Sequence, residues 1–312
     1  MNKQSTFPPR FTDPALTAKG EARAHVAQTA LRTLWLNTGT LCNLACAHCY
    51  IESTPTNDAL VYLTLDEAVT YLDEIAADSL PTEEIGITGG EPFMNPAIIP
   101  IMEESLRRGF RLLVLTNAMR PMMKLAAPLA DLQARYPGKI TMRVSVDHYE
   151  QALHEEERGP RSWQPMMEGL QWLADNGFTI DIAGRLRWND DEQVMRDGFA
   201  AFFTTNDIPV DAHDPKQLML FPELDENAEV PEITTACWGI LNVNPEAMMC
   251  ATSRMVVKHK GDSAPSVIAC TLLPYENGFN LGRTLKDASG AVPLNHPHCA
   301  KFCVLGGGSC SA

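Results

Sequence analysis

The chain alternates between short apolar runs and longer segments with a helical repeat, from residue 31 to about residue 210. A continuous apolar run of about four to eight residues indicates a strand buried on both faces, and apolar positions three or four residues apart indicate an amphipathic helix. Strands are therefore expected at residues 31–38, 85–88, 111–117, 139–147 and 178–184. Helices are expected to start at Thr64 and to occupy residues 95–109, 121–136, 163–177 and 190–205.

Local signals mark the ends of these helices. Thr64 and Glu67 are spaced as a capping box, in which each side chain accepts a hydrogen bond from the backbone of the other. Gly109 is expected to end the second helix, because glycine readily adopts the left-handed conformation that closes a helix. Pro128 lies inside the segment 121–136 and predicts a kink there.

Strands and helices that alternate in this way form βα units around a parallel sheet. Ligands in such folds bind at the carboxyl ends of the strands. The polar residues that follow the five expected strands should therefore meet at one mouth. These residues are Cys42 to Cys49, Gly89-Gly90-Glu91, Asn117, Ser145 with Asp147, and Arg185.

The pattern changes after about residue 211. Residues 211–232 are rich in proline and acidic residues and are expected to form a linker or an extended crossing. The remainder has little regular periodicity and is expected to fold around metal rather than around an apolar core. The expected parts are an N-terminal extension at residues 1–30, a barrel at 31–225 and a small cysteine-rich extension at 226–312.

Composition and charge narrow the class of protein. The 312 residues are 45% hydrophobic and 21% charged, with a formal net charge of −14. These values are typical of a soluble globular protein, and the negative charge disfavours a nucleic-acid partner. No run of about 18 apolar residues predicts a membrane span. The first 27 residues lack the apolar core of a secretory signal, so a cytoplasmic protein is expected.

Nine cysteines fall into two groups, and the odd number argues against disulfides in a cytoplasmic protein. Cys42, Cys46 and Cys49 lie close together, whereas the other six lie in the last quarter of the chain. Structural zinc needs four ligands, and His48 is poorly placed between Cys46 and Cys49 to be the fourth. Three thiolates in a tight loop instead suit a [4Fe–4S] cluster that keeps one iron without a protein ligand.

The spacing CxxxCxxC after the first expected strand, with Tyr50 after the last cysteine, resembles the radical S-adenosylmethionine (SAM) superfamily. The second strand ends in TGGEP at residues 88–92, which resembles the GGE motif of that family. The resemblance implies an α/β fold, a partial (β/α)6 TIM-like barrel, with a [4Fe–4S] cluster at the three early cysteines and SAM on its open iron. It implies SAM contacts from Tyr50, Gly89, Gly90, Glu91 and Pro92.

Two further strand ends resemble segments that reach the ribose and the methionine carboxylate of SAM in that family. They are LTN at 115–117 and SVD at 145–147, which add Asn117, Ser145 and Asp147 to the expected contacts. Arg185 is expected to pair with the SAM carboxylate. Local turn capping by Asn117 and Ser145 and a surface position for Arg185 are the alternatives. The segment HEEERGPR at 154–161 is interpreted as a solvated helix end, with a substrate contact as the alternative.

The late cysteines form a second candidate site. Asn244-Pro245-Glu246 predicts a turn between Cys237 and Cys250, and thus a hairpin that points both thiols at one metal. This pair, FNLGRTL at 279–285 and HCAKFCVLGGGSC at 298–310 together resemble the cluster-binding extensions called SPASM or twitch domains. The resemblance implies one auxiliary [4Fe–4S] cluster, with two clusters or a zinc site as alternatives. Its expected ligands are Cys237 and Cys250 with two of Cys270, Cys299, Cys303 and Cys310.

The function that the resemblance implies is a radical SAM oxidoreductase. The reduced cluster would cleave SAM to a 5′-deoxyadenosyl radical, which would abstract hydrogen from a peptide or a small metabolite. A reductant such as flavodoxin or ferredoxin is implied as a partner, and no catalytic acid or base is assigned. The alternative is a non-catalytic iron–sulfur protein for electron transfer or cluster assembly, which would need the cysteines but not TGGEP.

Overall fold

The computed structural model describes residues 8–188, 191–223 and 229–306. Within these residues, nine strands form one sheet in the order β10-β9-β8-β2-β3-β4-β5-β6-β7. The strands from β8 through β2 to β7 are parallel, and β9 and β10 continue the sheet by antiparallel pairing. Their bounds are β2 Thr33–Asn37, β3 Glu84–Thr88, β4 Arg111–Thr116, β5 Ile140–Ser145, β6 Thr179–Leu186, β7 Leu218–Pro222, β8 Ser253–Val257, β9 Ser266–Ile268 and β10 Asn280–Gly282.

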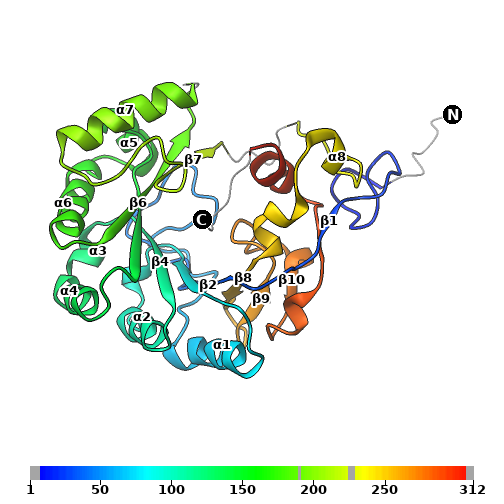
Figure 1. Cartoon of the computed structure of the whole chain (residues 1–312), viewed down its shortest axis with the longest axis horizontal. Helices are drawn as coiled ribbons and strands as arrows, with labels where there is room; N and C mark the ends of the chain where they lie inside the picture. The colour runs from blue at the N-terminus through cyan, green and yellow to red at the C-terminus, as the bar shows by residue number, and fades with distance from the viewer. Residues whose placement is uncertain (1–7, 189–190, 224–228, 307–312) are drawn as a thin grey trace.

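Helices α1 to α7 cover the outer face of the curved sheet from β2 to β7 (Figure 1). Each connects one strand to the next parallel strand, which confirms the predicted βα units and the partial barrel. None of the described helices is long and apolar enough to cross a membrane. The helices are α1 Leu65–Ala77, α2 Ile98–Arg107, α3 Arg120–Met123, α4 Ala126–Arg135, α5 Gln151–Arg158, α6 Trp163–Asp175 and α7 Glu192–Thr205.

The start of α1 shows how closely the local signals are followed. The Thr64 hydroxyl accepts a hydrogen bond from the Glu67 backbone N–H at 3.3 Å, and the Glu67 carboxylate accepts one from the Thr64 N–H at 3.0 Å. The predicted capping box is therefore confirmed. The kink predicted at Pro128 is wrong in position. The helical segment is interrupted earlier, at Lys124 and Leu125, between α3 and α4. Pro128 lies in the first turn of α4, where its missing N–H costs no helical hydrogen bond.

Alternation along the strands separates two apolar cores. On β2, Leu34 and Leu36 belong to the core beneath the helices, whereas Trp35 faces the other side of the sheet and a second core. Gly86 on β3 makes room for the Trp35 ring, because a Cβ there would lie 2.4 Å from ring atoms. The inner face of the sheet is therefore available for a site and for the C-terminal part of the chain.

Part of residues 211–232, which were expected to form a linker or an extended crossing, is a strand of the barrel. They contain β7, which pairs in parallel with β6 and is the sixth barrel strand in sequence order. Only five residues form this strand, LMLFP, and proline-rich acidic segments flank it, so no periodicity marked it in the sequence.

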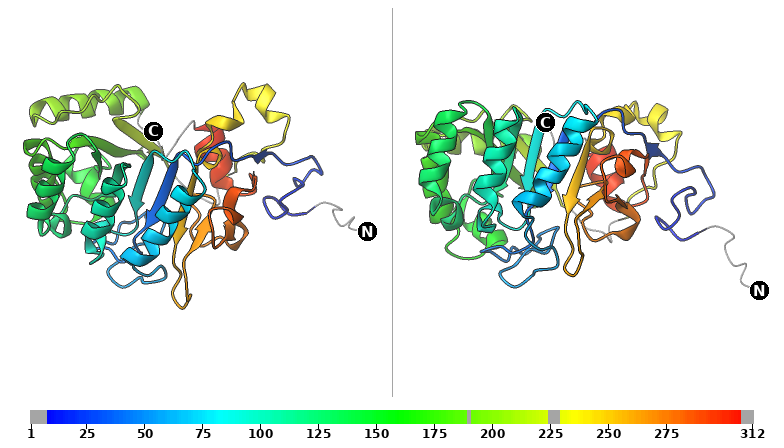
Figure 2. Two further views of the ribbon diagram at one scale, coloured as in Figure 1. Left: turned by 60° about the horizontal axis from the view of Figure 1, so that its bottom comes forward. Right: turned by 90° about the horizontal axis from the view of Figure 1, so that it is seen from below.

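The cysteine-rich part is not held together by metal ligands alone, which corrects a second expectation. All five residues of β8 are buried beside β2, and a core that includes Met249, Met255, Ile268 and Phe302 packs around them. The N-terminal segment joins this part, because β1 (His25–Val26) pairs with β11 (Val292–Pro293). Figure 2 shows the two segments side by side.

The predicted hairpin between Cys237 and Cys250 does not form. Cys237 begins the short helix α8 (Cys237–Leu241), and two single 3-10 turns follow at Pro245–Ala247 and Met249–Ala251. The Asn244 side chain accepts a hydrogen bond from the Glu246 N–H at 3.0 Å and so caps a 3-10 turn rather than a β-turn between strands. Further 3-10 turns lie at Pro92–Met94, Asn277–Phe279 and Asp287–Ser289, and Cys299–Leu305 is a π-helix.

A buried ion pair fixes the N-terminal segment to the C-terminal part. Arg23 donates to Glu232 at 2.6 Å, with side chains that are 0% and 8% exposed, and it also donates to the Leu294 carbonyl. We expect Glu232→Ala to lower the free energy of unfolding by about 3 kcal/mol, because it leaves the Arg23 charge buried without its partner. The measurement is urea unfolding under anaerobic conditions.

Glu83→Ala is the control for this prediction. Glu83 pairs with Arg32 at the surface, where both side chains are more than half exposed. Such a pair contributes no more than about 1 kcal/mol. Equal losses in the free energy of unfolding in the two variants would contradict a larger stabilising role for the Arg23–Glu232 pair.

Candidate cluster and cofactor site

One cavity at the carboxyl ends of the barrel strands collects most of the residues singled out in the sequence. Their loops follow β2, β3, β4 and β5, and Arg185 comes from β6 itself, which extends to Leu186 rather than ending at residue 184. Glu91 and Pro92 are buried and are not among the residues that line the cavity. Those that line it are Cys42, Cys46, Cys49, Tyr50, Gly89, Gly90, Asn117, Ser145, Asp147 and Arg185.

The three early thiols face this cavity from the loop after β2. The sulfur of Cys42 accepts a hydrogen bond from the Leu44 N–H, and that of Cys49 accepts one from the Ser53 N–H, both at 3.4 Å. Burial raises the pKa of the Cys42 thiol to about 12 and also raises the pKa of Cys46. A metal group binds cysteine as the thiolate. A cluster bound here would therefore have to stabilise the thiolate forms of Cys42 and Cys46 against the effect of burial.

The donor set fits an iron–sulfur cluster with one open iron. It offers three thiols and N–H···S hydrogen bonds, which tune such clusters. Among the described residues, no group of three or more His, Cys, Asp or Glu side chains is placed to hold a single metal ion.

The Gly89-Gly90 turn lies directly against the start of the cysteine loop. Gly90 donates its N–H to the Gly39 carbonyl at 2.7 Å, and Glu91 donates to the Leu41 carbonyl at 3.1 Å. A Cβ on Gly90 would lie 2.3 Å from the Leu41 oxygen, so only glycine allows this approach. These two N–H groups are therefore already paired within the protein.

Glu91 joins the ends of two barrel strands from behind the cavity wall. Its carboxylate accepts hydrogen bonds from the Asn117 N–H and the Thr116 hydroxyl, both at 2.9 Å, and from the Phe93 N–H at 3.2 Å. Burial raises the pKa of the Glu91 carboxyl to about 7, although these three donors act in the opposite direction. The side chain therefore positions the end of β4 relative to the glycine turn.

Asn117 combines the capping role with a contact to the cysteine loop. Its side-chain oxygen accepts a hydrogen bond from the Met119 N–H at 3.1 Å, and its amide nitrogen donates to the Asn43 side chain at 3.0 Å. The backbone at Ala118 is left-handed and packs on Gly169 of α6, where a Cβ would lie 1.7 Å from the Ala118 oxygen. The turn that carries Asn117 is thus fixed from both sides.

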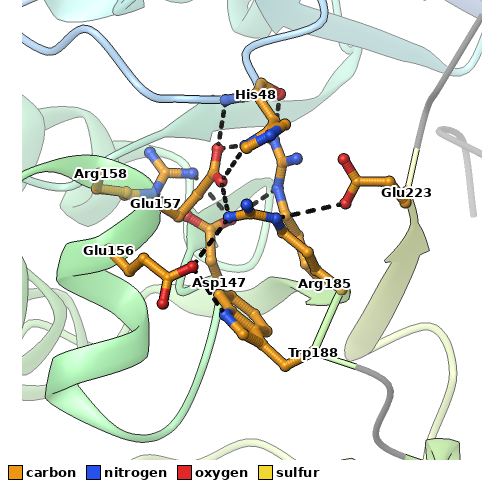
Figure 3. Close-up of polar contacts among 9 residues, drawn as sticks. His48, Asp147, Glu156, Glu157, Arg158, Arg185, Trp188 and Glu223 are labelled. Atoms are coloured by element: carbon orange, nitrogen blue, oxygen red, sulfur yellow. Dashed lines mark hydrogen bonds and ion pairs between the residues drawn. The ribbon is translucent and has the colours of Figure 1, made fainter.

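Two arginines share the buried Asp147 carboxylate. Arg158 donates a short hydrogen bond to it, and Arg185 donates through Nε at 3.2 Å (Figure 3). Burial acts to raise the pKa of Asp147, but Arg158 and Arg185 outweigh it and lower the pKa. Both arginines line the cavity, so they present positive charge beside the thiols. Arg185 is not the surface arginine of the alternative interpretation, because its side chain is 19% exposed.

The segment 154–161 contains the end of α5, as predicted, but only one of its faces is solvated. His154 and Glu157 are fully buried in α5, with the His154 ring edge-on to Trp163 at 5.3 Å. Arg158 lines the cavity, so the alternative of a contact with a bound molecule suits it better than a solvated position. Residues 154, 157 and 158 share one helical face, so periodicity rather than polarity was the available signal.

Four late thiols line a second, almost wholly apolar cavity with His298. Cys237, which was expected among the ligands, is not among the residues that line it, and Cys310 lies outside the described residues. Burial raises the pKa of Cys250 to about 11 and that of Cys299 to about 12. Leu272 lines both this cavity and the barrel cavity. The four thiols belong to Cys250, Cys270, Cys299 and Cys303.

The sequence and the structure of the chain resemble those of known proteins. The chain is 27% identical over 276 residues to the antilisterial bacteriocin subtilosin biosynthesis protein AlbA of Bacillus subtilis strain 168, covering 82% of this chain and 58% of AlbA. It is 30% identical over 140 residues to the GTP 3′,8-cyclase of Haemophilus influenzae strain PittEE, covering 44% of this chain and 39% of the cyclase.

The structure of Streptococcus suis SuiB bound to S-adenosylmethionine superposes with a TM-score of 0.59. It shares 12% identity, over 81% of this chain and 63% of SuiB, and this likeness shows a common fold. The chain thus spans about three fifths of the length of AlbA and of SuiB. Residues 36–197, more than half of the chain, match the model of the Radical SAM superfamily. With its cysteine loop and glycine turn at one cavity, the chain belongs to the radical SAM superfamily.

Proposed function

We propose that the chain is a radical SAM oxidoreductase that abstracts hydrogen from a peptide substrate. The observation that carries this proposal is the single cavity shared by the three early thiols, the glycine turn and the paired arginines. Cys42, Cys46 and Cys49 would hold a [4Fe–4S] cluster, which when reduced would supply the electron for cleavage of SAM to methionine and a 5′-deoxyadenosyl radical. The protein supplies binding, orientation and exclusion of water.

The roles of the individual residues follow from their places in the cavity. In this proposal Cys42, Cys46 and Cys49 hold the cluster. Gly89 and Gly90 let the methionine part of SAM approach the backbone, and Tyr50, Asn117, Ser145 and Arg185 line the remaining walls. Glu91 and Pro92 support the glycine turn from behind, and Asp147 fixes Arg158 and Arg185.

We further propose one auxiliary [4Fe–4S] cluster, with Cys250, Cys270, Cys299 and Cys303 as its ligands. The shared cavity supports this set of ligands. Compared with the set expected from the sequence, it omits Cys237, which does not line the cavity. The side chain of Leu272 borders both cavities, so a cluster there would lie close to the substrate. A second auxiliary cluster that uses Cys237 or Cys310 is the alternative, and iron analysis distinguishes about eight from about twelve irons per chain.

The relatives support a peptide over a small metabolite. AlbA is named for the biosynthesis of a bacteriocin, and a SuiB structure contains the precursor peptide SuiA. The name of the GTP 3′,8-cyclase relative points to a small substrate instead, but that match covers less than half of this chain. Free thiols and the implied clusters suit a reducing compartment. The proposal therefore includes a cytoplasmic location and flavodoxin or ferredoxin as reductant.

The peptide assignment predicts which material stimulates the enzyme. The anaerobically reconstituted protein is given SAM, dithionite and a cell extract separated by size into a peptide fraction and a metabolite fraction. We expect the peptide fraction to raise the yield of 5′-deoxyadenosine. The mass of one peptide should decrease at the same time by the mass of the hydrogen atoms removed. The measurement is quantitative liquid chromatography with mass detection.

The control is the same incubation without SAM. Stimulation by the metabolite fraction alone would contradict the peptide assignment while leaving the radical SAM chemistry intact. Release of 5′-deoxyadenosine at one unchanged rate in both fractions would also contradict it, because an authentic substrate couples cleavage to hydrogen abstraction.

A further inference from the structure

The turn between the second and third early cysteines rests on one buried residue of α5. The backbone carbonyl of Glu157 accepts a hydrogen bond from the Ala47 N–H at 2.9 Å. Its carboxylate accepts another from the His48 N–H at 2.9 Å and pairs with His48 Nδ1 at 2.9 Å. Ala47 and His48 are the two residues between Cys46 and Cys49. Glu157 therefore contacts both residues of this turn, and Figure 3 shows its contacts with His48.

The opposite side of the turn is held by Arg185. Its guanidinium donates to the His48 carbonyl at 2.9 Å and reaches the Glu157 carboxylate at 3.7 Å. Arg187 completes the surroundings of Glu157 with an ion pair at 3.0 Å. The N–H, the carbonyl and the ring of His48 are thus all bound, by the side chains of Glu157 on α5 and Arg185 on β6.

Burial of the Glu157 carboxylate costs free energy unless these contacts compensate for the lost hydration. Its side chain is 0% exposed, and a buried carboxylate is stable only with ionic and hydrogen-bonding partners. It also lies in the last turn of α5, where the helix dipole disfavours negative charge. Neither helix capping nor packing calls for an acid at this position. The cysteine turn and the two arginines supply what stabilises it.

We propose that Glu157 is a positioning residue that holds the Cys46–Cys49 turn in the conformation that accepts and retains the early cluster. The inference rests on the proposed cluster role of Cys42, Cys46 and Cys49. It assigns Glu157 no contact with SAM or substrate. Its loss should first be seen as faster escape of iron from the early site, because a looser turn lets solvent and chelator reach the thiolates.

The experiment measures iron loss from anaerobically reconstituted full-length protein to a ferrous chelator. Groups that orient metal ligands change metal affinity by about 10- to 100-fold when removed. We expect Glu157→Ala to release about four irons per chain at least tenfold faster than the unchanged protein, and Glu157→Gln to be intermediate, because it keeps one oxygen acceptor. His48→Ala, which removes only the ring contact, should accelerate release by a smaller factor.

Glu156→Gln is the matched control. Glu156 is the neighbouring acid on the same helix and is 51% exposed; it accepts a hydrogen bond from Trp188 and shares Arg187 with Glu157, at 3.5 Å. We expect its iron loss to equal that of the unchanged protein. The late cluster serves as an internal reference, since its iron should leave at the same rate in all variants.

The outcomes separate this inference from the proposed function. If the unchanged protein holds no iron at Cys42, Cys46 and Cys49, the proposed function fails. If it holds the cluster and Glu157→Gln and His48→Ala retain it equally long, the positioning role is wrong. Faster loss from both sites together would mean general unfolding and would also overturn it. Should Glu157→Ala not fold, the Glu157→Gln and His48→Ala series decides alone.

Discussion

Joint replacement of Cys42, Cys46 and Cys49 by alanine is expected to abolish the formation of 5′-deoxyadenosine from SAM. Without these thiols no iron–sulfur group can be held beside the glycine turn, and no electron reaches the sulfonium. The iron content should fall from about eight to about four atoms per chain, because the auxiliary cluster proposed at the late thiols would remain. The measurements are product formation after dithionite reduction and iron analysis of the same sample.

A matched variant that lacks thiols of the late site tests whether the chain has two separate thiol sites. Replacement of Cys250 and Cys299, which line the second cavity, should also leave about four irons per chain. That variant should still cleave SAM, because its early site is intact. Complete loss of iron in the early-site variant would contradict the two-site account. Persistent SAM cleavage without Cys42, Cys46 and Cys49 would contradict the placement of the cofactor.

Gly90→Ala is expected to disable the cofactor site without removing any ligand. The new Cβ would lie 2.3 Å from the Leu41 oxygen and 2.7 Å from the Thr40 oxygen, and both are backbone atoms that cannot turn away. The loop must shift, and Leu41 directly precedes Cys42. We expect the affinity for SAM to fall at least about tenfold, or about 1.4 kcal/mol. The measurement is equilibrium binding of SAM to the reconstituted protein.

Gly239→Ala is the control for the glycine prediction. Nothing lies within 4 Å of a Cβ placed on Gly239, which sits in α8 and has no left-handed backbone. Alanine is favoured over glycine in a helix, so SAM binding should not change. A Gly90→Ala protein that binds SAM as tightly as this control would show that the close approach of the two loops is not needed.

Local patterns were enough to predict the barrel. The five strands predicted from apolar runs all form, and Thr64 and Glu67 cap α1 as their spacing indicated. The carboxyl ends of parallel strands meet at one edge, so the residues after those strands also meet at one cavity. These outcomes depend on rules that act over a few residues, or on the geometry of parallel sheets.

Contacts between distant segments were not predictable from one sequence. β7 is too short and too irregularly flanked to show a period, and its place in the sheet is set by β6. The C-terminal part lacks helical or strand periodicity, yet β8 is buried because it adds to the edge of β2. The hairpin expected at Asn244-Pro245-Glu246 failed because the same turn signal also caps a 3-10 turn.

The charged segment 154–161 shows the same limit at the site. A run of acids and arginines most often faces water, and only the folded chain shows that Glu157 and Arg158 turn inward against the cysteine loop. The charge of Glu157 is balanced by Arg185 and Arg187, about 30 residues further along the chain, and that of Arg158 by Asp147 from the end of another element. Pairing of this kind depends on tertiary structure, so polarity alone misassigned the segment.

Reductive cleavage of SAM in this cavity can be measured from its products. The protein is reconstituted anaerobically, reduced with dithionite and incubated with SAM, and 5′-deoxyadenosine is quantified with and without added cell extract. We expect 5′-deoxyadenosine in amounts that match the methionine released. A reduced protein with an intact early cluster that forms none, with or without extract, would contradict it and favour a non-catalytic iron–sulfur protein.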